Sequence, residues 1–181
     1  MATMESGMVP LGTPCPEFAL PGVDGRTWKR AEFRAPALLV IFMCNHCPYV
    51  QAVDDRINEL AREYQGRCDV VGICANDAEQ YPEDSFEAMG HRAEEKGYRF
   101  RYLHDADQEA ARAFGAVCTP DFFLFGPDRR LAYRGRLDDN WKDPAKVKRR
   151  DLREAIEALL AGEAPRKLQK PSMGCSLKWK A

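Results

Sequence analysis

The sequence lacks the hydrophobic stretches that would place it across a membrane. No apolar run approaches the ~20 residues that a membrane-spanning helix needs. The opening residues 1–18 contain neither the basic nor the apolar segment of a secretory signal. We therefore expect no membrane association and a cytoplasmic location, where thiols are kept reduced.

The sequence also lacks an excess of charge of either sign. Lys and Arg number 27 against 28 Asp and Glu, which gives a formal net charge of −1. Proteins that bind nucleic acid or anionic membranes usually carry a basic surface patch. The even balance of charges therefore predicts no nucleic-acid partner and no membrane partner.

The cysteines do not form the pattern of a disulfide framework. There are seven of them, an odd number with irregular spacing. A chain of 181 residues buries about 70% of its unfolded surface and needs no disulfide or metal to fold. Only Cys44 and Cys47 are close in sequence, and a Cys-x-x-Cys spacing in a cytosolic protein is typical of redox or metal chemistry.

Apolar periodicity and turn residues predict a single α/β domain with a mixed central sheet. Residues 16–28 predict a β-hairpin, and the uninterrupted apolar run 36–43 predicts a central strand covered on both faces. Residues 121–137 predict a second hairpin. The domain is expected to cover residues 1–181, with 163–181 as a C-terminal tail. The remaining expected elements are strands at 68–75 and 98–105 and helices at 48–65, 84–96, 105–114 and 143–161.

The cysteine pair lies where the central strand ends and a helix begins, in the segment IFMCNHCPYV. Unpaired N–H groups and the helix dipole stabilise a thiolate there, which lowers a cysteine pKa from about 8.5 into the range ~3.5–7.5. A protonated His46 would lower it further. The spacing also allows Cys44 and Cys47 to close a disulfide, and this predicts a redox pair.

Proline at position 48 favours Cys47 as the attacking thiolate. Proline suits the first position of a helix because it has no N–H to leave unpaired, and this makes Cys47 the N-cap. Cys44 would then resolve from the preceding loop. A helix that began at Asn45 would also tolerate Pro48 and would leave Cys44 near the dipole, so both orders remain open.

Several segments are similar to one protein family. The motifs G-T-P-C-P-E-F-x-L-P-G-x-D-G, F-x-C-N-H-C-P-Y-V, T-P-D-F-F-L-F and Y-R-G-R-L-D-D resemble thioredoxin-like redoxins of the AhpC/TSA (alkyl hydroperoxide reductase/thiol-specific antioxidant) family. The ending G-C-S-L-K-W-K resembles that of an uncharacterised subgroup with the same C-N-H-C-P-Y-V segment. The resemblance implies a thioredoxin fold with an N-terminal β-hairpin, and thiol-based redox chemistry.

The resemblance also implies a set of site residues. Thr119-Pro120 resembles the loop whose proline is cis and faces the redox cysteine, and a cis proline is a specific feature. The expected catalytic set is Cys47, Cys44, His46, Thr119 and Pro120. Two further cysteines are candidates for a resolving thiol because one precedes this loop and the other lies in the tail; they are Cys118 and Cys175.

Two departures weaken a peroxidase assignment. Peroxiredoxins carry Pro-x-x-x-Thr/Ser-x-x-Cys, whereas this chain has Val40 and Cys44 at the first two of those positions. They also place an arginine before the strand that corresponds to 121–125, where this chain has Thr119. We therefore expect disulfide exchange rather than peroxide reduction as the main activity.

The sequence thus predicts a thiol–disulfide oxidoreductase of cell redox homeostasis that needs no bound cofactor. Its partners would be a protein or small-molecule disulfide and a thiol electron donor such as a thioredoxin or glutathione system. Three alternatives remain: an antioxidant thiol peroxidase, an interaction module without turnover, and a zinc or iron–sulfur protein. The last would use Cys44, Cys47, Cys118 and Cys175 as ligands.

Overall fold

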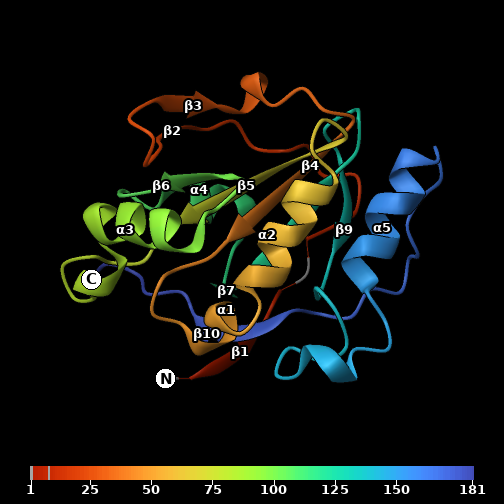
Figure 1. Ribbon diagram of the computed structural model, residues 1–181. Coiled ribbons are helices and arrows are strands. Elements are labelled where there is room, and N and C mark those ends of the chain that lie inside the picture. Colours follow the sequence, from red (N-terminus) through yellow and green to blue (C-terminus); the bar gives the residue numbers. More distant parts are fainter. Residues whose placement is uncertain (1, 8) are drawn as a thin grey trace.

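A five-stranded mixed sheet forms the centre of this computed structural model, which describes residues 2–7 and 9–181. The strand order is β6-β5-β4-β8-β9. The central strand β4 (Ala37–Phe42) is buried along its whole length, as its apolar sequence predicts (Figure 1). It pairs in parallel with β5 (Cys68–Cys74) and antiparallel with β8 (Asp121–Phe125). The expected mixed sheet is therefore confirmed.

Two outer strands complete this sheet. β6 (Arg101–His104) runs parallel to β5, and β9 (Leu131–Arg134) runs antiparallel to β8. The pair β8–β9 is the predicted second hairpin. Parallel β4 and β5 end at the same edge of the sheet, and the loop that follows β4 at this edge carries the Cys-x-x-Cys segment.

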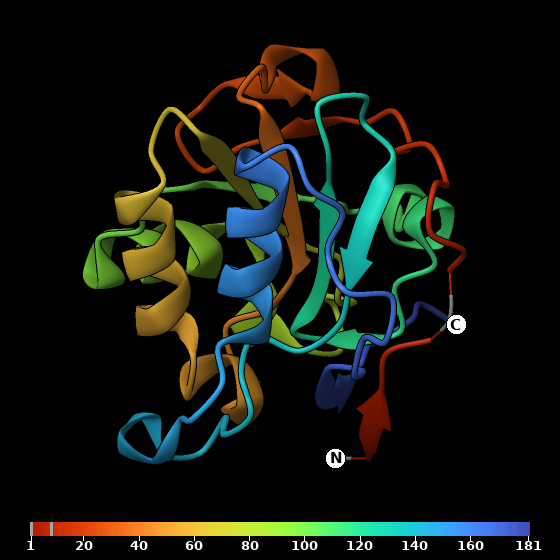
Figure 2. The same ribbon diagram turned by 90° about the vertical axis from the view of Figure 1, so that its right-hand side faces the viewer.

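The two faces of the sheet are covered by different elements. Leu39 and Ile41 of β4 belong to a core cluster with α2 (Asp54–Glu63) and α5 (Asp151–Leu160). Leu38, Val40 and Phe42 point the opposite way, into a cluster with the N-terminal hairpin and α4 (Glu109–Phe114). Figure 2 shows gold α2 and blue α5 on one side of the sheet and green α4 on the other. Strand alternation thus produces two separate cores.

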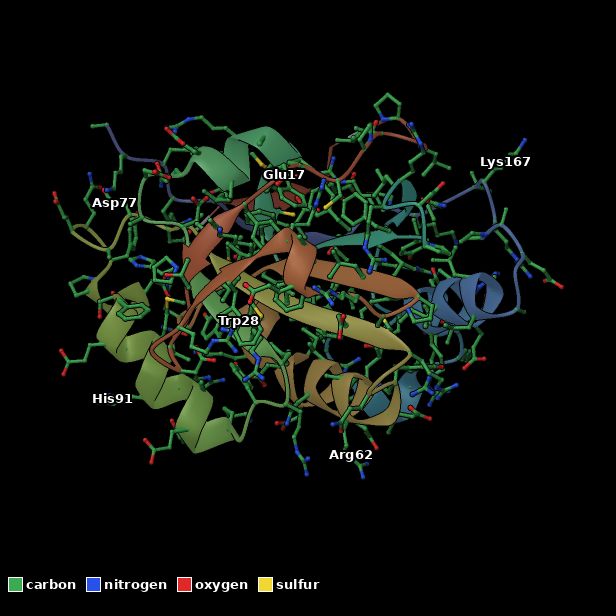
Figure 3. All side chains as sticks on the ribbon, turned by 90° about the horizontal axis from the view of Figure 1, so that it is seen from above. Glu17, Trp28, Arg62, Asp77, His91 and Lys167 are labelled. Carbon is green, nitrogen blue, oxygen red and sulfur yellow. The ribbon has the colours of Figure 1, made fainter. Side chains whose placement is uncertain are left out.

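The predicted N-terminal hairpin is present. It consists of β2 (Ala19–Pro21) and β3 (Thr27–Lys29), which pair antiparallel. Trp28 of β3 is buried in the core cluster that contains α4, and Figure 3 looks down on the molecule from the side of this hairpin. The hairpin therefore acts as a cover for one face of the sheet.

The helix expected after Pro48 is divided into two. α1 (Pro48–Gln51) is one turn long, and α2 begins at Asp54. Val53 interrupts them because its backbone angles, φ −122° and ψ −6°, lie outside the helical range. The buried Asp54 carboxylate is held there by Arg92 at 2.6 Å and by the Tyr98 hydroxyl at 3.0 Å.

The last helix begins later than expected. Asp143-Pro144 starts a short 3₁₀ turn (Pro144–Lys146), and α5 begins only at Asp151. The backbone is extended at Val147, and the Lys148 N–H donates to the Asp139 carboxylate at 2.9 Å, which keeps the intervening segment out of the helix. α3 (Phe86–Lys96) ends at Gly97 as predicted. Within residues 2–7 and 9–181, no helix has the length and apolar character needed to cross a membrane.

A second sheet joins segments that are distant in sequence. The C-terminal strand β10 (Met173–Ser176) lies between β1 (Thr3–Glu5) and β7 (Cys118–Thr119) and is antiparallel to both. Figure 1 shows this sheet beside α1, below the main sheet. Part of the expected tail 163–181 is therefore an ordered strand, and it lies beside the helix that begins at Pro48.

Candidate active site

Cys47 lies directly before the first turn of α1. It is the N-cap residue, with extended backbone angles of φ −73° and ψ 122°, and Pro48 is the first helical residue. The predicted N-cap position of Cys47 is therefore confirmed, and the alternative helix start at Asn45 does not occur. The Val50 N–H in this turn donates to the Cys47 carbonyl at 3.0 Å. Cys44 lies farther back, in the loop that follows β4.

Two other cysteine sulfurs contact the Cys47 sulfur. Cys175 Sγ of β10 lies 2.7 Å from Cys47 Sγ, and the Cys44 thiol hydrogen-bonds to Cys47 from the preceding loop. All three cysteines are free, and their exposed fractions are 1% for Cys44, 0% for Cys47 and 2% for Cys175. The structure thus brings together the predicted pair and one of the two candidate resolving thiols.

These contacts favour a thiolate at Cys47. The hydrogen bond from Cys44 lowers the pKa of Cys47 most, and hydrogen bonds from Cys175, Thr119 and the Val50 N–H add to it. Burial opposes this effect, and the resulting pKa is about 5. The same hydrogen bond raises the pKa of Cys44 well above its ordinary value, together with burial and the negative charge of Asp84. Cys47 is therefore the ionised member of the pair at neutral pH.

The loop of Thr119 and Pro120 faces the cysteine pair. The Thr119–Pro120 peptide bond is cis, as predicted. The Thr119 carbonyl oxygen lies 3.3 Å from Cys47 Sγ, and the Thr119 hydroxyl lies 3.5 Å from Cys44 Sγ. Cys118, the neighbouring residue of β7, instead directs its thiol to the Pro120 carbonyl at 3.7 Å. Burial raises the pKa of Cys118, so this cysteine is held as a neutral thiol.

His46 is oriented by the buried carboxylate of Asp84. Its Nδ1 hydrogen-bonds to one carboxylate oxygen, and its ring stacks on Tyr81 at 5.4 Å with an angle of 7° between the planes. Asp84 also accepts the Asn45 N–H at 2.7 Å and the Asn76 side-chain amide at 2.9 Å. Asp84 therefore holds the loop between Cys44 and Cys47 in place. His46 contributes to this by binding Asp84, and it does not contact the Cys47 sulfur.

The residues that could hold a metal differ from those expected. Among the described residues, Cys44, His46 and Asp84 form the one cluster of three metal-ligating side chains whose ligand atoms lie within 4.8 Å of one another. The four-cysteine set with Cys118 and Cys175 is not such a cluster. His46 and Asp84 are hydrogen-bonded directly to each other, so an ion would have to separate them. The cluster fits a hydrogen-bonded network better than a metal site.

Asp84 and its partners are not predictable as site residues from the sequence. The segment around Asp84 reads as the start of a helix, where acidic residues are common. In the structure Ser85 is the N-cap of α3, and Asp84 ends a 3₁₀ turn (Pro82–Asp84) directed into the protein. Tyr102 contributes as well, because its hydroxyl donates to the Asn45 side chain at 2.8 Å.

A cavity of about 340 Å³ is lined by sequence neighbours of the site residues, although none of the cysteines lines it. Tyr49 and Pro120, which are sequence neighbours of Pro48 and Thr119, form part of its wall, and Trp141 packs on Tyr49 with ring centroids 4.2 Å apart. Most of the wall is apolar, and it carries charges of both signs, Arg136 and Lys170 against Glu5, Asp138 and Asp139. The cavity has the apolar wall and the few polar groups typical of a ligand site. The other lining residues are Val53, Phe122, Leu137, Pro171, Ser172 and Met173.

Comparison with known proteins identifies one matching family. Residues 11–134 match the model of the AhpC/TSA family. A search of curated proteins found no match. The chain is 46% identical to an uncharacterised conserved protein from Geobacillus kaustophilus, with a TM-score of 0.95 and coverage of 99% of this chain and 97% of the other. A hypothetical protein from Sinorhizobium meliloti 1021 is 43% identical, with a TM-score of 0.91 and coverage of 98% of both chains.

More distant structures share the fold. A putative thioredoxin from Neisseria meningitidis is 24% identical with a TM-score of 0.57, over 66% of this chain and 77% of the other. A secreted disulfide oxidoreductase from Mycobacterium tuberculosis is 18% identical with a TM-score of 0.55, over 63% and 79%. At these identities the similarity concerns the fold, and the predicted thioredoxin fold is confirmed.

Proposed function

The chain belongs to the AhpC/TSA family, and on this premise we propose that it is a thiol–disulfide oxidoreductase in which Cys47 is the attacking nucleophile. The observation that carries this proposal is the position of Cys47 at the N-cap of α1, with Cys175 Sγ 2.7 Å from its sulfur and the cis Thr119–Pro120 bond beside it. In this position the pKa of Cys47 is lowered to about 5. At neutral pH the group is then a thiolate, the form that attacks disulfides. The low pKa arises at a helix N-cap, which agrees with the sequence-based choice of Cys47 over Cys44.

The reaction begins when the Cys47 thiolate attacks one sulfur of a substrate disulfide. A bond forms between Cys47 and that sulfur, the substrate S–S bond breaks, and the other substrate sulfur leaves as a thiolate. A second thiol of the protein then attacks Cys47 Sγ and releases the first substrate sulfur. Cys44 supports this step because it already hydrogen-bonds to Cys47. The substrate gains two electrons, and the protein is left with one disulfide.

Thr119 and His46 would assist without taking part in bond exchange. The Thr119 hydroxyl lies 3.5 Å from Cys44 Sγ, and the Thr119 side chain also lowers the pKa of Cys47, so it can stabilise negative charge on either sulfur. His46 and Asp84 hold the loop that carries Cys44. We assign Thr119 to stabilisation of the thiolate and His46 to positioning of the loop.

Peroxide reduction is the second candidate function, because the same thiolate could attack a peroxide oxygen and the family includes peroxidases. The groups that lower the pKa of Cys47 are all neutral: two thiols, the Thr119 side chain and the Val50 N–H. Among the described residues no guanidinium hydrogen-bonds to this sulfur. A peroxide would therefore lack a cationic partner there, and we rank disulfide exchange first.

We further propose that the reducing equivalents come from a thiol donor such as a thioredoxin or glutathione system, and that the protein works in the cytoplasm. The Cys47 disulfide must be reduced before another turnover, and one dithiol or two monothiol molecules can do this by the same exchange chemistry. The substrate would be a protein disulfide or a small-molecule disulfide. The chemistry described here needs no bound cofactor.

The test compares two substrates under one set of conditions. Insulin disulfide reduction and hydrogen peroxide consumption are measured for the wild-type protein with dithiothreitol as donor. We expect disulfide turnover to exceed peroxide turnover and Cys47→Ser to abolish both. Cys68→Ser is the matched control, because Cys68 is equally buried but lies at the start of β5. Faster peroxide turnover would reverse the ranking, and absence of both activities would favour an interaction module.

A further inference from the structure

We propose that Cys175, on the C-terminal strand β10, resolves the mixed disulfide on Cys47, so that the C-terminal segment is a working part of the redox site. This inference rests on the function proposed above and assigns the second thiol of that reaction. The sequence expects Cys44 in this role and offers Cys118 and Cys175 as further candidates; the inference selects Cys175.

Strand pairing fixes the position of Cys175. Within β10 it lies opposite Thr119 of β7 on one side and opposite Thr3 of β1 on the other. Gly174 lets the strand approach closely, because a Cβ at that position would lie 2.0 Å from the Thr119 carbonyl oxygen. The Leu177 N–H donates to the Val117 carbonyl at 3.0 Å. Cys175 is thus held on the Thr119–Pro120 loop with its sulfur 2.7 Å from Cys47 Sγ.

Side chains hold the segment on both sides of Cys175. Before it, the Ser172 hydroxyl donates to the Pro120 carbonyl at 2.8 Å. After it, the Lys178 N–H donates to the Asn76 side chain at 2.9 Å, and the Asp77 N–H donates to the Lys178 carbonyl at 2.8 Å. These contacts fix a segment 128 residues beyond Cys47. A sulfur held within contact distance needs little movement to form a bond of about 2.05 Å.

The charges around the two candidate resolving thiols favour Cys175. A resolving thiol must lose its proton to attack, so nearby positive charge helps and negative charge hinders. Lys178 and the Tyr49 N–H both lower the pKa of Cys175. Near Cys44 the charge of Asp84 has the opposite effect and raises its pKa. Resolution by Cys175 is therefore electrostatically easier.

The contact between Cys47 and Cys175 also sets the order of the two steps. While Cys47 is a thiolate, its charge and its hydrogen bond help keep the pKa of Cys175 at about 12, to which burial contributes most. Once Cys47 is bonded to a substrate sulfur it carries no charge, and these two contributions disappear. Cys175 thus becomes easier to ionise only after Cys47 has reacted. The two thiols do not compete for the substrate.

The resolving step is an ordinary thiol–disulfide exchange. Cys175 loses its proton, and its sulfur attacks Cys47 Sγ. The Cys47–Cys175 bond forms as the bond from Cys47 to the substrate breaks, and the released substrate thiolate takes up one proton. The substrate disulfide has been reduced by two electrons, and the Cys47–Cys175 pair has been oxidised by two. An external dithiol then reduces this pair.

The test follows the two steps with 5,5′-dithiobis(2-nitrobenzoate) as the disulfide. Attack by Cys47 releases one nitrothiobenzoate ion, and resolution releases the second. We compare wild type with Cys44→Ser, Cys175→Ser and Cys118→Ser. The last is the control, since Cys118 is buried in the same sheet with its thiol directed to Pro120. Non-reducing peptide mapping identifies the disulfide formed, and circular dichroism verifies that each variant is folded.

We expect Cys175→Ser to slow the second release at least about tenfold while the first release persists. Cys118→Ser should keep both releases at the wild-type rates. Cys44→Ser removes the thiol that lowers the Cys47 pKa most and should slow the first release, but the second should still follow it, and mapping should find Cys47 joined to Cys175. Lys178→Met gives a second measurement, because it should slow only the second release. If Cys175→Ser releases the second ion at the wild-type rate and Cys44→Ser does not, Cys44 resolves and this inference is wrong, although the proposed function stands. Absence of the first release from folded wild-type protein would overturn both.

Discussion

The sulfur atoms of Cys47 and Cys175 lie 2.7 Å apart although 128 residues separate them in sequence. A helix N-cap supplies one sulfur and the middle strand of a small three-stranded sheet supplies the other. Both side chains are buried, together with that of Cys44. The site therefore combines a local motif, whose chemistry can be predicted, with a long-range contact that only the folded chain creates.

The first prediction concerns the pH dependence of Cys47. Its pKa is lowered to about 5, so its thiolate should persist from neutral pH down to that value and be lost as the pH falls through it. The rate of iodoacetamide labelling at Cys47, measured by mass spectrometry, should therefore fall with a midpoint near pH 5. Thr119→Val removes one donor to this sulfur and should move the midpoint upward. A midpoint near 8.5, the value for a free cysteine, would show that the contacts do not stabilise the thiolate.

The second prediction concerns Gly174 and the attachment of β10. A Cβ at this position would lie 2.0 Å from the Thr119 carbonyl oxygen and 2.5 Å from its carbon. These are backbone atoms of a paired strand and cannot move aside easily. Gly174→Ala should therefore destabilise the protein by roughly 1–3 kcal/mol, speed the labelling of Cys47 by bulky reagents and lower the yield of the Cys47–Cys175 disulfide.

Gly90→Ala is the control for this experiment. Gly90 lies inside α3, where a Cβ would meet nothing within 4 Å, and alanine favours a helix by about 1 kcal/mol over glycine. This variant should keep or raise stability and leave Cys47 labelling unchanged. Equal labelling of Cys47 in both variants would mean that β10 does not control access to the sulfur.

The third prediction concerns Asp84 and the reactivity of Cys44. The Asp84 charge contributes to the raised pKa of Cys44, so Asp84→Asn should lower that pKa and speed Cys44 alkylation at pH 8. The same change weakens the hydrogen bonds to Asn45 and His46, at a cost of roughly 1–3 kcal/mol of stability. Asp105→Asn, at a buried carboxylate that accepts N–H groups of α4 at 2.8 and 3.2 Å, should leave Cys44 unchanged. An unchanged Cys44 rate in Asp84→Asn would contradict the electrostatic explanation.

Much of the fold could be predicted because local signals agree with it. The run 36–43 is apolar at every position, which suits a strand buried on both faces, and β4 is such a strand. Pro48 marks the helix start, so Cys47 could be placed at the N-cap from sequence alone. The central strand and the helix start depend on residues that are neighbours in sequence, and tertiary packing favours the same local structures.

The rest depends on contacts that no local pattern reveals. The sequence of β10, Met-Gly-Cys-Ser, contains a glycine and no β-branched residue, and it forms a strand because β7 and β1 pair with it. The apolar helical periodicity continues across the break at Val53, and the break is followed by the buried Asp54, which forms ion pairs with Arg92 and Lys96. Asp84 enters the site through a 3₁₀ turn whose residues are typical of a helix start. In each case a distant partner determines the outcome.

The last prediction concerns substrate binding in the cavity whose wall includes Tyr49 and Pro120. Trp141 packs on Tyr49 at 4.2 Å between ring centroids, and both residues line the cavity. Truncating an aromatic residue that anchors a ligand typically costs about 2 kcal/mol or more of binding free energy. Trp141→Ala should therefore raise KM for a peptide disulfide with an aromatic residue beside its cysteine by roughly tenfold or more. The value of kcat should change little, because Trp141 is not among the groups that hydrogen-bond to the Cys47 sulfur.

Trp179→Ala serves as the control, since Trp179 is 40% exposed and does not line the cavity. Loss of kcat without a change in KM would instead indicate that Trp141 positions α1, and the substrate would then have to bind elsewhere.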